Sequence, residues 1–143
     1  MRAWRLCRAA FADLSGDGAA AYGGRWNSPG RPLVYLADTA ALAILEVRVH
    51  LDLPPDLLPD DYKLVRVDLG DLPVETLTAF PDDPRAFGDG WLDEGRSPLL
   101  RVPSFIVPEC DNLLLNPRHG LAGAAQVIEA RPFAFDRRLW LPF

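Results

Sequence analysis

LVYLADTAALAILEVRVH, which occupies residues 33–50, joins a strand pattern directly to a helix pattern. Residues 33–37 are apolar or aromatic and predict a β-strand. Asp38 or Thr39 can cap a helix that runs to about His50, because a short side-chain oxygen accepts hydrogen bonds from the free amides of the first turn. The apolar residues cover so much of this helix that we expect it to be largely buried.

Composition indicates how the rest of the chain is built. The chain has 143 residues, of which 49% are hydrophobic, so it can bury one sizeable core, and we expect one domain over residues 1–143. Fourteen prolines and eleven glycines divide the sequence into short elements, which argues against a helical bundle. The predicted fold class is therefore α+β, a single compact domain in which a mixed sheet carries a few short helices.

The remaining elements follow from apolar runs between turn signals. Asn27-Ser28-Pro29-Gly30 predicts a reversal into the strand at 33–37, and hence a hairpin. Two turn lengths that differ by one residue fit this segment, and a shift of one residue moves a side chain to the opposite face of the sheet. The sequence therefore does not decide whether Arg25 and Tyr35 share a face. A short helix is predicted at 85–95, loops at 53–61 and 70–84, and further strands at about 3–8, 63–69, 99–107, 113–115, 125–129 and 133–135.

Charge and hydropathy argue against several classes of protein. A net charge of −5 disfavours direct binding to nucleic acid, which requires cations to replace condensed counterions. No apolar stretch approaches the roughly 20 residues that span a bilayer. Because residues 1–5 lead straight into a strand pattern, we expect no targeting segment and a cytoplasmic location. Cys7 and Cys110 lie far apart and are expected to be free thiols.

Glu46 is the most informative residue for chemistry. A carboxylate among Leu42, Leu45 and Val49 loses hydration unless something compensates it. From its position alone, a structural ion pair or an exposed strip of the helix, with His50 one turn away, is favoured over an active site. The residues around Glu46 do not by themselves decide between them.

Arg25 follows two glycines, which let a ligand approach the main chain, and its guanidinium can bind phosphate oxygens in pairs. That combination suits the pyrophosphate of a dinucleotide, but also a surface ion pair beside a turn. Tyr35 is either a ligand contact or a core residue. Ser104 lacks the G-x-S-x-G pattern of a hydrolase nucleophile. His50 and His119 show no metal-ligand spacing, so no metal site is expected.

Several motifs, taken in order along the chain, resemble proteins of the RES domain family. They cover nearly the whole chain, from Trp4-Arg5 to the last predicted strand, and their common order makes the likeness specific. The motifs are Gly24-Arg25-Trp26-Asn27, Val34-Tyr35, Ala41-Leu42-Ala43-Ile44-Leu45-Glu46 with His50, Val102-Pro103-Ser104, Asn112-Leu113-Leu114-Leu115-Asn116-Pro117-Arg118-His119 and Phe133-Ala134-Phe135-Asp136-Arg137-Arg138-Leu139. One departure is Arg48, where the family more often has an apolar residue.

The resemblance implies a fold similar to ADP-ribosyltransferases and a toxin that consumes NAD as its substrate, with no prosthetic group. It also implies an Xre-type helix-turn-helix antitoxin, encoded beside the toxin, which binds DNA, blocks the toxin's pocket and forms a hetero-oligomer with it. The family's key residues map onto Arg25, Tyr35, Glu46 and Ser104 as catalytic residues. Arg25, Tyr35 and Ser104 would also bind NAD, together with Trp26 and Asn116.

Cleavage of NAD explains why a single carboxylate suffices. Nicotinamide leaves as a neutral molecule and needs no acid to protonate it, unlike the leaving groups of ordinary glycosidases. Glu46 would stabilise the oxocarbenium-like ribose, and Arg25 would hold the pyrophosphate. Tyr35 would order the nicotinamide-side ribose or ring, and Ser104 would position Glu46 or the nicotinamide end.

The acceptor of the ADP-ribose stays open at this point. Phosphate, water or a target protein would each fit, and the last would make the protein an ADP-ribosyltransferase. Arg5, Arg48 and Arg118 are conceivable contributors to a phosphate pocket. The alternative from another class is a non-catalytic module that binds a nucleotide or a partner through its acidic surface.

Overall fold

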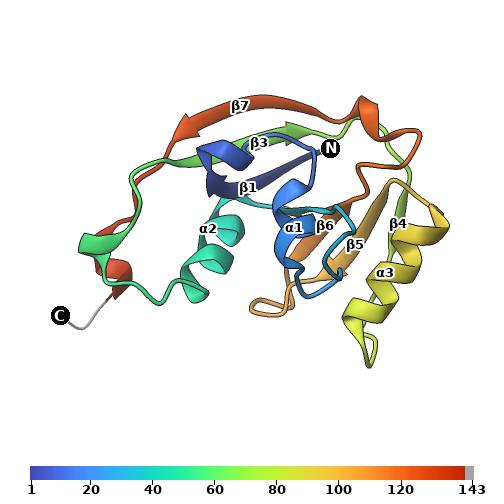
Figure 1. Ribbon diagram of the computed structural model, residues 1–143, viewed down its shortest axis with the longest axis horizontal. Coiled ribbons are helices and arrows are strands. Elements are labelled where there is room, and N and C mark those ends of the chain that lie inside the picture. The colour runs from blue at the N-terminus through green and yellow to red at the C-terminus, as the bar shows by residue number, and fades with distance from the viewer. Residues whose placement is uncertain (141–143) are drawn as a thin grey trace.

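A computed structural model describes residues 1–140, which form one mixed sheet with helices packed against it (Figure 1). The strands are β1 (Arg2–Arg8), β2 (Val34–Ala37), β3 (Tyr62–Asp68), β4 (Val74–Thr76), β5 (Leu99–Pro103), β6 (Asp111–Leu115) and β7 (Gln126–Pro132). The α-helices are α1 (Asp17–Tyr22), α2 (Ala40–Val49) and α3 (Pro84–Glu94), and short 3-10 turns lie at Ala9–Phe11, Pro55–Leu57, Ala122–Ala124 and Arg137–Trp140. The predicted α+β class and single compact domain are confirmed.

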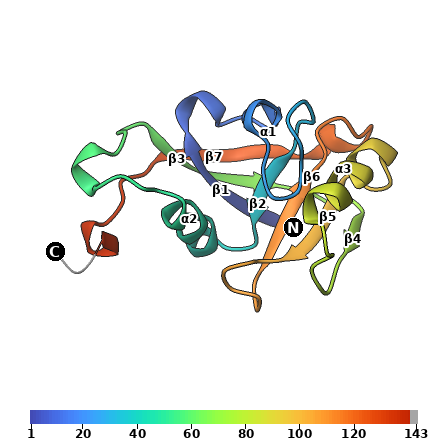
Figure 2. The same ribbon diagram turned by 60° about the horizontal axis from the view of Figure 1, so that its bottom comes forward.

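The sheet has the strand order β4-β5-β6-β2-β1-β3-β7, and the pairing between β2 and β1 near its centre is short. All neighbours are antiparallel except β4 and β5. β1 pairs with β3 along its whole length, but it pairs with β2 only where Trp4 faces Ala37. The sheet therefore consists of two half-sheets, β7-β3-β1 and β2-β6-β5-β4, which separate on one side of that pair (Figure 2).

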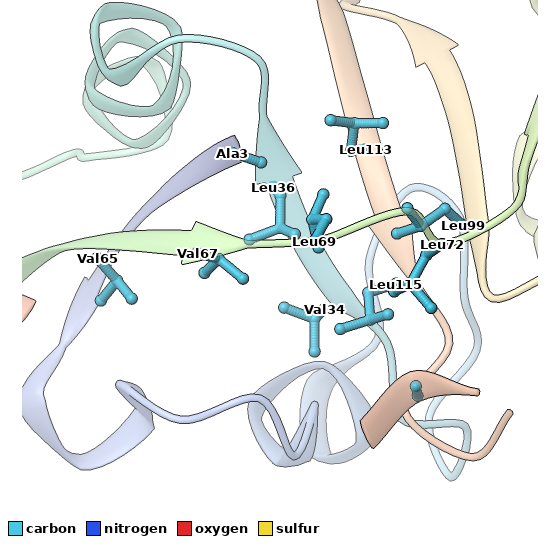
Figure 3. Close-up of a cluster of buried hydrophobic side chains, with 11 residues drawn as sticks. Ala3, Val34, Leu36, Val65, Val67, Leu69, Leu72, Leu99, Leu113 and Leu115 are labelled. Atoms are coloured by element: carbon cyan, nitrogen blue, oxygen red, sulfur yellow. The ribbon is translucent and has the colours of Figure 1, made fainter. Parts of the chain in front are cut away.

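One apolar core spans both half-sheets (Figure 3). Successive strand residues point to opposite faces, so alternate residues of β1, β2, β3, β5 and β6 meet on the same side. Each fully buried leucine or valine there contributes about 1.5–3 kcal/mol to folding. The buried residues of this core are Ala3, Val34, Leu36, Val65, Val67, Leu69, Leu72, Leu99, Leu113, Leu115 and Ala122.

The predicted helix at 39–50 is confirmed as α2, but it is less buried than its apolar sequence suggested. Thr39 caps it, and the Thr39 Oγ1 accepts a hydrogen bond from the Leu42 amide at 3.1 Å. Leu42 and Ala43 are buried, whereas the Val49 side chain is 48% exposed. Ile44 and Val47 pack against β1 and β3, and Leu42 and Ala43 pack against Ala37 of β2, whereas Glu46 lies along the cavity described below.

The expected hairpin before β2 is wrong. α1 precedes the turn, and residues 23–27 form only an isolated bridge between Gly24 and Asn27. β2 pairs instead with β6 and β1, which lie far away in sequence. Hydrogen bonds to distant residues hold the turn, so its local sequence could not indicate a strand partner.

The outer elements show smaller differences. β4 lies within the segment 70–84 that was expected to be loop, and it pairs in parallel with β5. Residues 133–135 are not a strand, because Phe135 packs edge to face on Tyr62, Phe133 and Trp140. The predicted helix at 85–95 is confirmed as α3, which ends at Gly95 with φ 61°. Among the described residues no helix is both long and apolar enough to cross a membrane.

Candidate active site

A cavity of about 580 Å³ opens where the two half-sheets separate. Pockets for small ligands usually have volumes of about 300–1,000 Å³. β1 and β2 line it at residues 4–7 and 35–37, α2 lines it with Glu46, and the turn before β2 contributes Arg25. The structure thus brings Arg25, Tyr35 and Glu46, three of the four predicted catalytic residues, to one cavity.

The Glu46 carboxylate is held by two hydrogen bonds from the β5–β6 hairpin. The Ser104 hydroxyl, which follows β5, donates to Glu46 Oε2 at 3.1 Å. The Asn112 amide, at the start of β6, donates to Glu46 Oε1 at 2.7 Å. Ser104 is fully buried, so it reaches the cavity only through Glu46. Neither an ion pair nor an exposed strip accounts for Glu46.

The polarity of these bonds fits a carboxylate and not a carboxylic acid. The Ser104 Oγ accepts from the amides of Ile106 and Val107, both at 3.2 Å, so its single proton is free to donate to Glu46. The Asn112 Nδ2 atom can only donate. Burial raises the pKa of Glu46 above its usual value, and the bonds from Asn112 and Ser104 oppose that shift.

Arg25 is exposed, and its guanidinium lies over the Phe105 ring at 3.9 Å from the ring centre. Within residues 1–140 no carboxylate lies in ion-pairing distance of Arg25. The alternative of a surface ion pair therefore has no support in the described part of the chain. The guanidinium keeps its donors available for an anionic ligand.

Tyr35 holds the main chain around Arg25. Its hydroxyl accepts a hydrogen bond from the Trp26 amide at 3.0 Å and donates to Asn27 Oδ1 at 2.6 Å. Burial raises the pKa of Tyr35 to about 12, so the hydroxyl keeps its proton at neutral pH. A Cβ at Gly24 would lie 2.5 Å from the Tyr35 Oη, which explains why a glycine precedes Arg25.

The same segment is fixed from the other side by α3. Arg85 donates from Nε and Nη2 to the Gly24 carbonyl at 3.1 and 3.0 Å. Asp89 accepts from the Ser28 amide at 2.8 Å. A Cβ at Gly88 would lie 1.8 Å from the Trp26 carbonyl oxygen, so the helix and the segment touch through their backbones.

Trp26 and Asn116 were expected to bind NAD, but neither side chain lies mainly in the cavity beside Glu46. The Trp26 side chain is 3% exposed, and its ring stacks on Phe80 at 6.0 Å and meets Phe87 edge to face. It touches the cavity but is mostly core. Asn116 lies in a separate cavity of about 440 Å³, where it donates to the Leu92 carbonyl. The structure does not bring Asn116 to Glu46.

The three arginines considered for a phosphate pocket, Arg5, Arg48 and Arg118, lie in different parts of the molecule. Arg5 lines the cavity and donates to the Asp13 carbonyl at 2.9 Å. Arg48 donates to the Leu139 carbonyl and lies over the Trp140 ring, so it belongs to the packing of the C-terminal segment. Arg118 lines the separate cavity that contains Asn116. Of the three, only Arg5 is placed to meet a ligand of Glu46.

His50 also lines the cavity, one helical turn after Glu46. In residues 1–140 no group of three or more His, Cys, Asp or Glu side chains could hold a metal ion. Cys7 and Cys110 are both free, as predicted. No role in the site was predicted for Asn112 or Asn27, although each belongs to a motif that carries the family resemblance.

Comparison with known proteins gives consistent results. The RES domain model matches residues 2–136. "Toxin Res" of Pseudomonas putida is 39% identical over 96% of this chain and 98% of the relative. The "Prs ADP-ribosylating toxin" of Sphingobium sp. is 38% identical over 89% of this chain and 86% of the relative.

A third relative, MbcT, is more distant. The "NAD(+) phosphorylase MbcT" of Mycobacterium tuberculosis is 40% identical over 46% of this chain and 38% of the relative. A chain in the crystal structure of the M. tuberculosis MbcT-MbcA toxin-antitoxin complex superimposes with a TM-score of 0.74 at 24% identity, over 93% of this chain and 84% of that chain. At that identity the superposition is evidence for the fold alone.

Proposed function

The chain belongs to the RES domain family, and from this premise we propose that it is a toxin enzyme that cleaves the bond between nicotinamide and ribose in NAD. One observation carries the proposal: Glu46, a half-buried carboxylate held by two donors, lines the same cavity as Arg25, which forms no ion pair within residues 1–140. We infer that a single RES domain spans residues 1–143.

The proposed reaction breaks the bond between the ribose carbon C1′ and the nicotinamide nitrogen. Nicotinamide keeps the electron pair and leaves as a neutral molecule, and positive charge develops on the ribose. The Glu46 carboxylate, already oriented by Ser104 and Asn112, stabilises that charge without having to reorganise. An acceptor oxygen then bonds to C1′: a water molecule releases one proton to the solvent, whereas an anionic phosphate oxygen has no proton to lose.

Arg25 is assigned to the pyrophosphate, which its guanidinium can bind through two parallel hydrogen bonds. Tyr35 supports this role, because its hydroxyl bonds to the Trp26 amide and to Asn27 Oδ1 and so fixes the backbone that carries Arg25. Ser104 is assigned to positioning Glu46. These contacts would fix the dinucleotide at its pyrophosphate and at the ribose beside the bond to be broken.

We propose phosphate or water as the acceptor. Arg5 offers a cation in the same cavity, and a relative carries the name NAD(+) phosphorylase. Transfer of ADP-ribose to a protein is the second candidate, favoured by the Sphingobium relative named as an ADP-ribosylating toxin.

As a toxin, the protein would act in the cytoplasm and be neutralised by an antitoxin of the Xre helix-turn-helix type. Tyr22 and Phe105 are exposed aromatic side chains at the cavity, with 81% and 61% of their surfaces accessible, and they offer such a partner an apolar contact. A helix-turn-helix protein encoded beside this gene would support the pairing.

One incubation tests the proposal. Purified protein is mixed with NAD, with and without phosphate, and the products are identified by mass spectrometry. Nicotinamide with ADP-ribose-1″-phosphate indicates phosphate as acceptor, and nicotinamide with free ADP-ribose indicates water. A mass increase on an added target protein indicates transfer. Saturable NAD binding without any nicotinamide release would overturn the enzyme assignment in favour of a binding module.

A further inference from the structure

We propose that Asn112 is a positioning residue that keeps Glu46 in its carboxylate form and fixes the plane of that carboxylate. The inference rests on the proposed function, since it specifies how the proposed catalytic group is prepared. Asn112 begins one of the motifs that carry the family resemblance, residues 112–119, but no role was predicted for it.

The place of Asn112 in the sheet gives the first argument. It lies on β6 between two partner strands, facing Ala37 of β2 and Val102 of β5. Its backbone is therefore held on both sides, and its side chain projects from a rigid part of the fold. Residues on such elements hold functional groups more accurately than residues on loops.

The hydrogen bonds of the Asn112 amide give the second argument. Its Nδ2 atom donates to the Leu36 carbonyl at 3.2 Å and to Glu46 Oε1 at 2.7 Å. The Leu36 carbonyl can only accept, so a flipped amide would place its oxygen against the carbonyl oxygen. The bond to the Leu36 carbonyl thus orients the amide so that its N–H groups point toward Glu46. A proton on Glu46 Oε1 would then lie against an N–H group, which is unfavourable.

Asn112 is a better probe than Ser104 for this role. The Ser104 hydroxyl also accepts from the Ile106 and Val107 amides, so removing it would disturb the loop that carries Phe105. Two other groups influence the pKa of Glu46: the neighbouring His50 lowers it, and Asp38 raises it. Cys110 lies near Glu46, and Arg5 and Arg25 line the same cavity. A test must therefore change Asn112 alone.

The first test is the pH dependence of nicotinamide release. In Asn112→Asp a second carboxyl replaces the donor, and the pair holds a proton to higher pH. The midpoint of the acidic limb of kcat/KM should rise by about one to three pH units. Asn112→Leu removes the donor without adding charge, so its midpoint should rise by about one unit. A wild-type midpoint in both variants would overturn the proposal.

Asn116→Asp is the matched control. It makes the same change at a buried asparagine that follows β6 but lies in the other cavity. Whatever this variant does to stability, its midpoint should equal that of the wild type. An equal rise in Asn116→Asp would mean that the shift reports general loosening and not the contact with Glu46.

A second readout does not depend on activity. In ¹³C- and ¹⁵N-labelled wild-type protein, the Asn112 side-chain amide signals should move with the same pH midpoint as the Glu46 carboxyl carbon. Independent midpoints would contradict the proposal even if neither variant folds. If the wild type releases no nicotinamide, the proposed function fails, while this titration still decides the role of Asn112.

Discussion

The two walls of the cavity are built in opposite ways. On the α2 wall, both oxygens of the Glu46 carboxylate are engaged by donors from the β5–β6 hairpin. On the opposite wall the backbone is fixed by Tyr35 and α3, but the Arg25 guanidinium rests on Phe105 and forms no ion pair within residues 1–140. In the first wall the Glu46 side chain itself is fixed. In the second wall the backbone is fixed, and the Arg25 side chain is held only by its contact with Phe105 among the described residues.

This difference matches two chemical tasks. A group that stabilises developing charge is most effective when it does not have to move, because its organisation precedes the reaction. A group that captures a flexible pyrophosphate gains from adjusting to it. The comparison therefore predicts that damage to the α2 wall reduces kcat, whereas damage to the Arg25 wall raises KM.

Glu46→Gln is expected to have the largest effect. It keeps the shape of the side chain but removes the charge that would face the ribose, so kcat should fall on the order of a thousandfold. The fold should persist, as judged by circular dichroism. Glu94→Gln, on the exposed side of α3, is the control and should keep wild-type activity. Substantial turnover by Glu46→Gln would remove the mechanism.

Gly88→Ala tests the backbone contact between α3 and the segment that carries Arg25. The new methyl group would lie 1.8 Å from the Trp26 carbonyl oxygen. Helix and segment must separate, at a cost of about 3 kcal/mol, which a urea unfolding curve would reveal. Gly90→Ala, two residues along the same helix, meets nothing within 4 Å and should instead stabilise the protein by about 0.5–1 kcal/mol. Similar behaviour of the two variants would refute the close contact.

Arg25→Ala should raise KM for NAD while leaving kcat nearly unchanged. Loss of charge-assisted hydrogen bonds to the pyrophosphate costs about 2 kcal/mol, equivalent to a rise in KM of roughly 30-fold. Steady-state kinetics should show a much smaller change in kcat, and stability should stay within about 0.5 kcal/mol because the side chain is exposed. Arg2→Ala removes an exposed cation outside the cavity and should change neither constant.

Tyr35→Phe should have the smallest effect, mostly on stability. It leaves the Trp26 amide and the Asn27 oxygen without their partner, which costs about 1–2 kcal/mol. Because the pKa of Tyr35 is raised to about 12 from 10.0, the hydroxyl stabilises the fold fully below pH 10, and that contribution is lost as pH rises toward 12. Unfolding curves should therefore show the wild type to be more stable than the variant at neutral pH, and the two should converge at strongly alkaline pH.

Local patterns predicted the parts of the site that depend on neighbouring residues. The Thr39 cap, the helix at α2 and the unusual position of Glu46 are all visible within a dozen residues. The resemblance to a known family then ordered Arg25, Tyr35, Glu46 and Ser104 into one hypothesis, and three of them line one cavity while the fourth bonds to Glu46.

Contacts between distant residues were not predictable in this way. Asn112 meets Glu46 across 66 positions, and Ser28 meets Asp89 across 61. Neither pair has a local signature, since an asparagine before an apolar run or an aspartate in a helix is ordinary. The expected hairpin failed for the same reason, because long-range bonds hold the turn before β2. The three residues of β4 were too few to show a periodic pattern.

The attachment of the Arg25 segment to α3 has a consequence for protein engineering. Residues 23–31 and 84–93 behave as one module, joined by Arg85, Asp89, the close approach at Gly88 and the paired Arg31 and Asp93. A designer who grafts the arginine loop onto another scaffold must transplant this helix with it. Chimeras between relatives should likewise exchange both segments together, because a crossover that separates them mismatches the two surfaces.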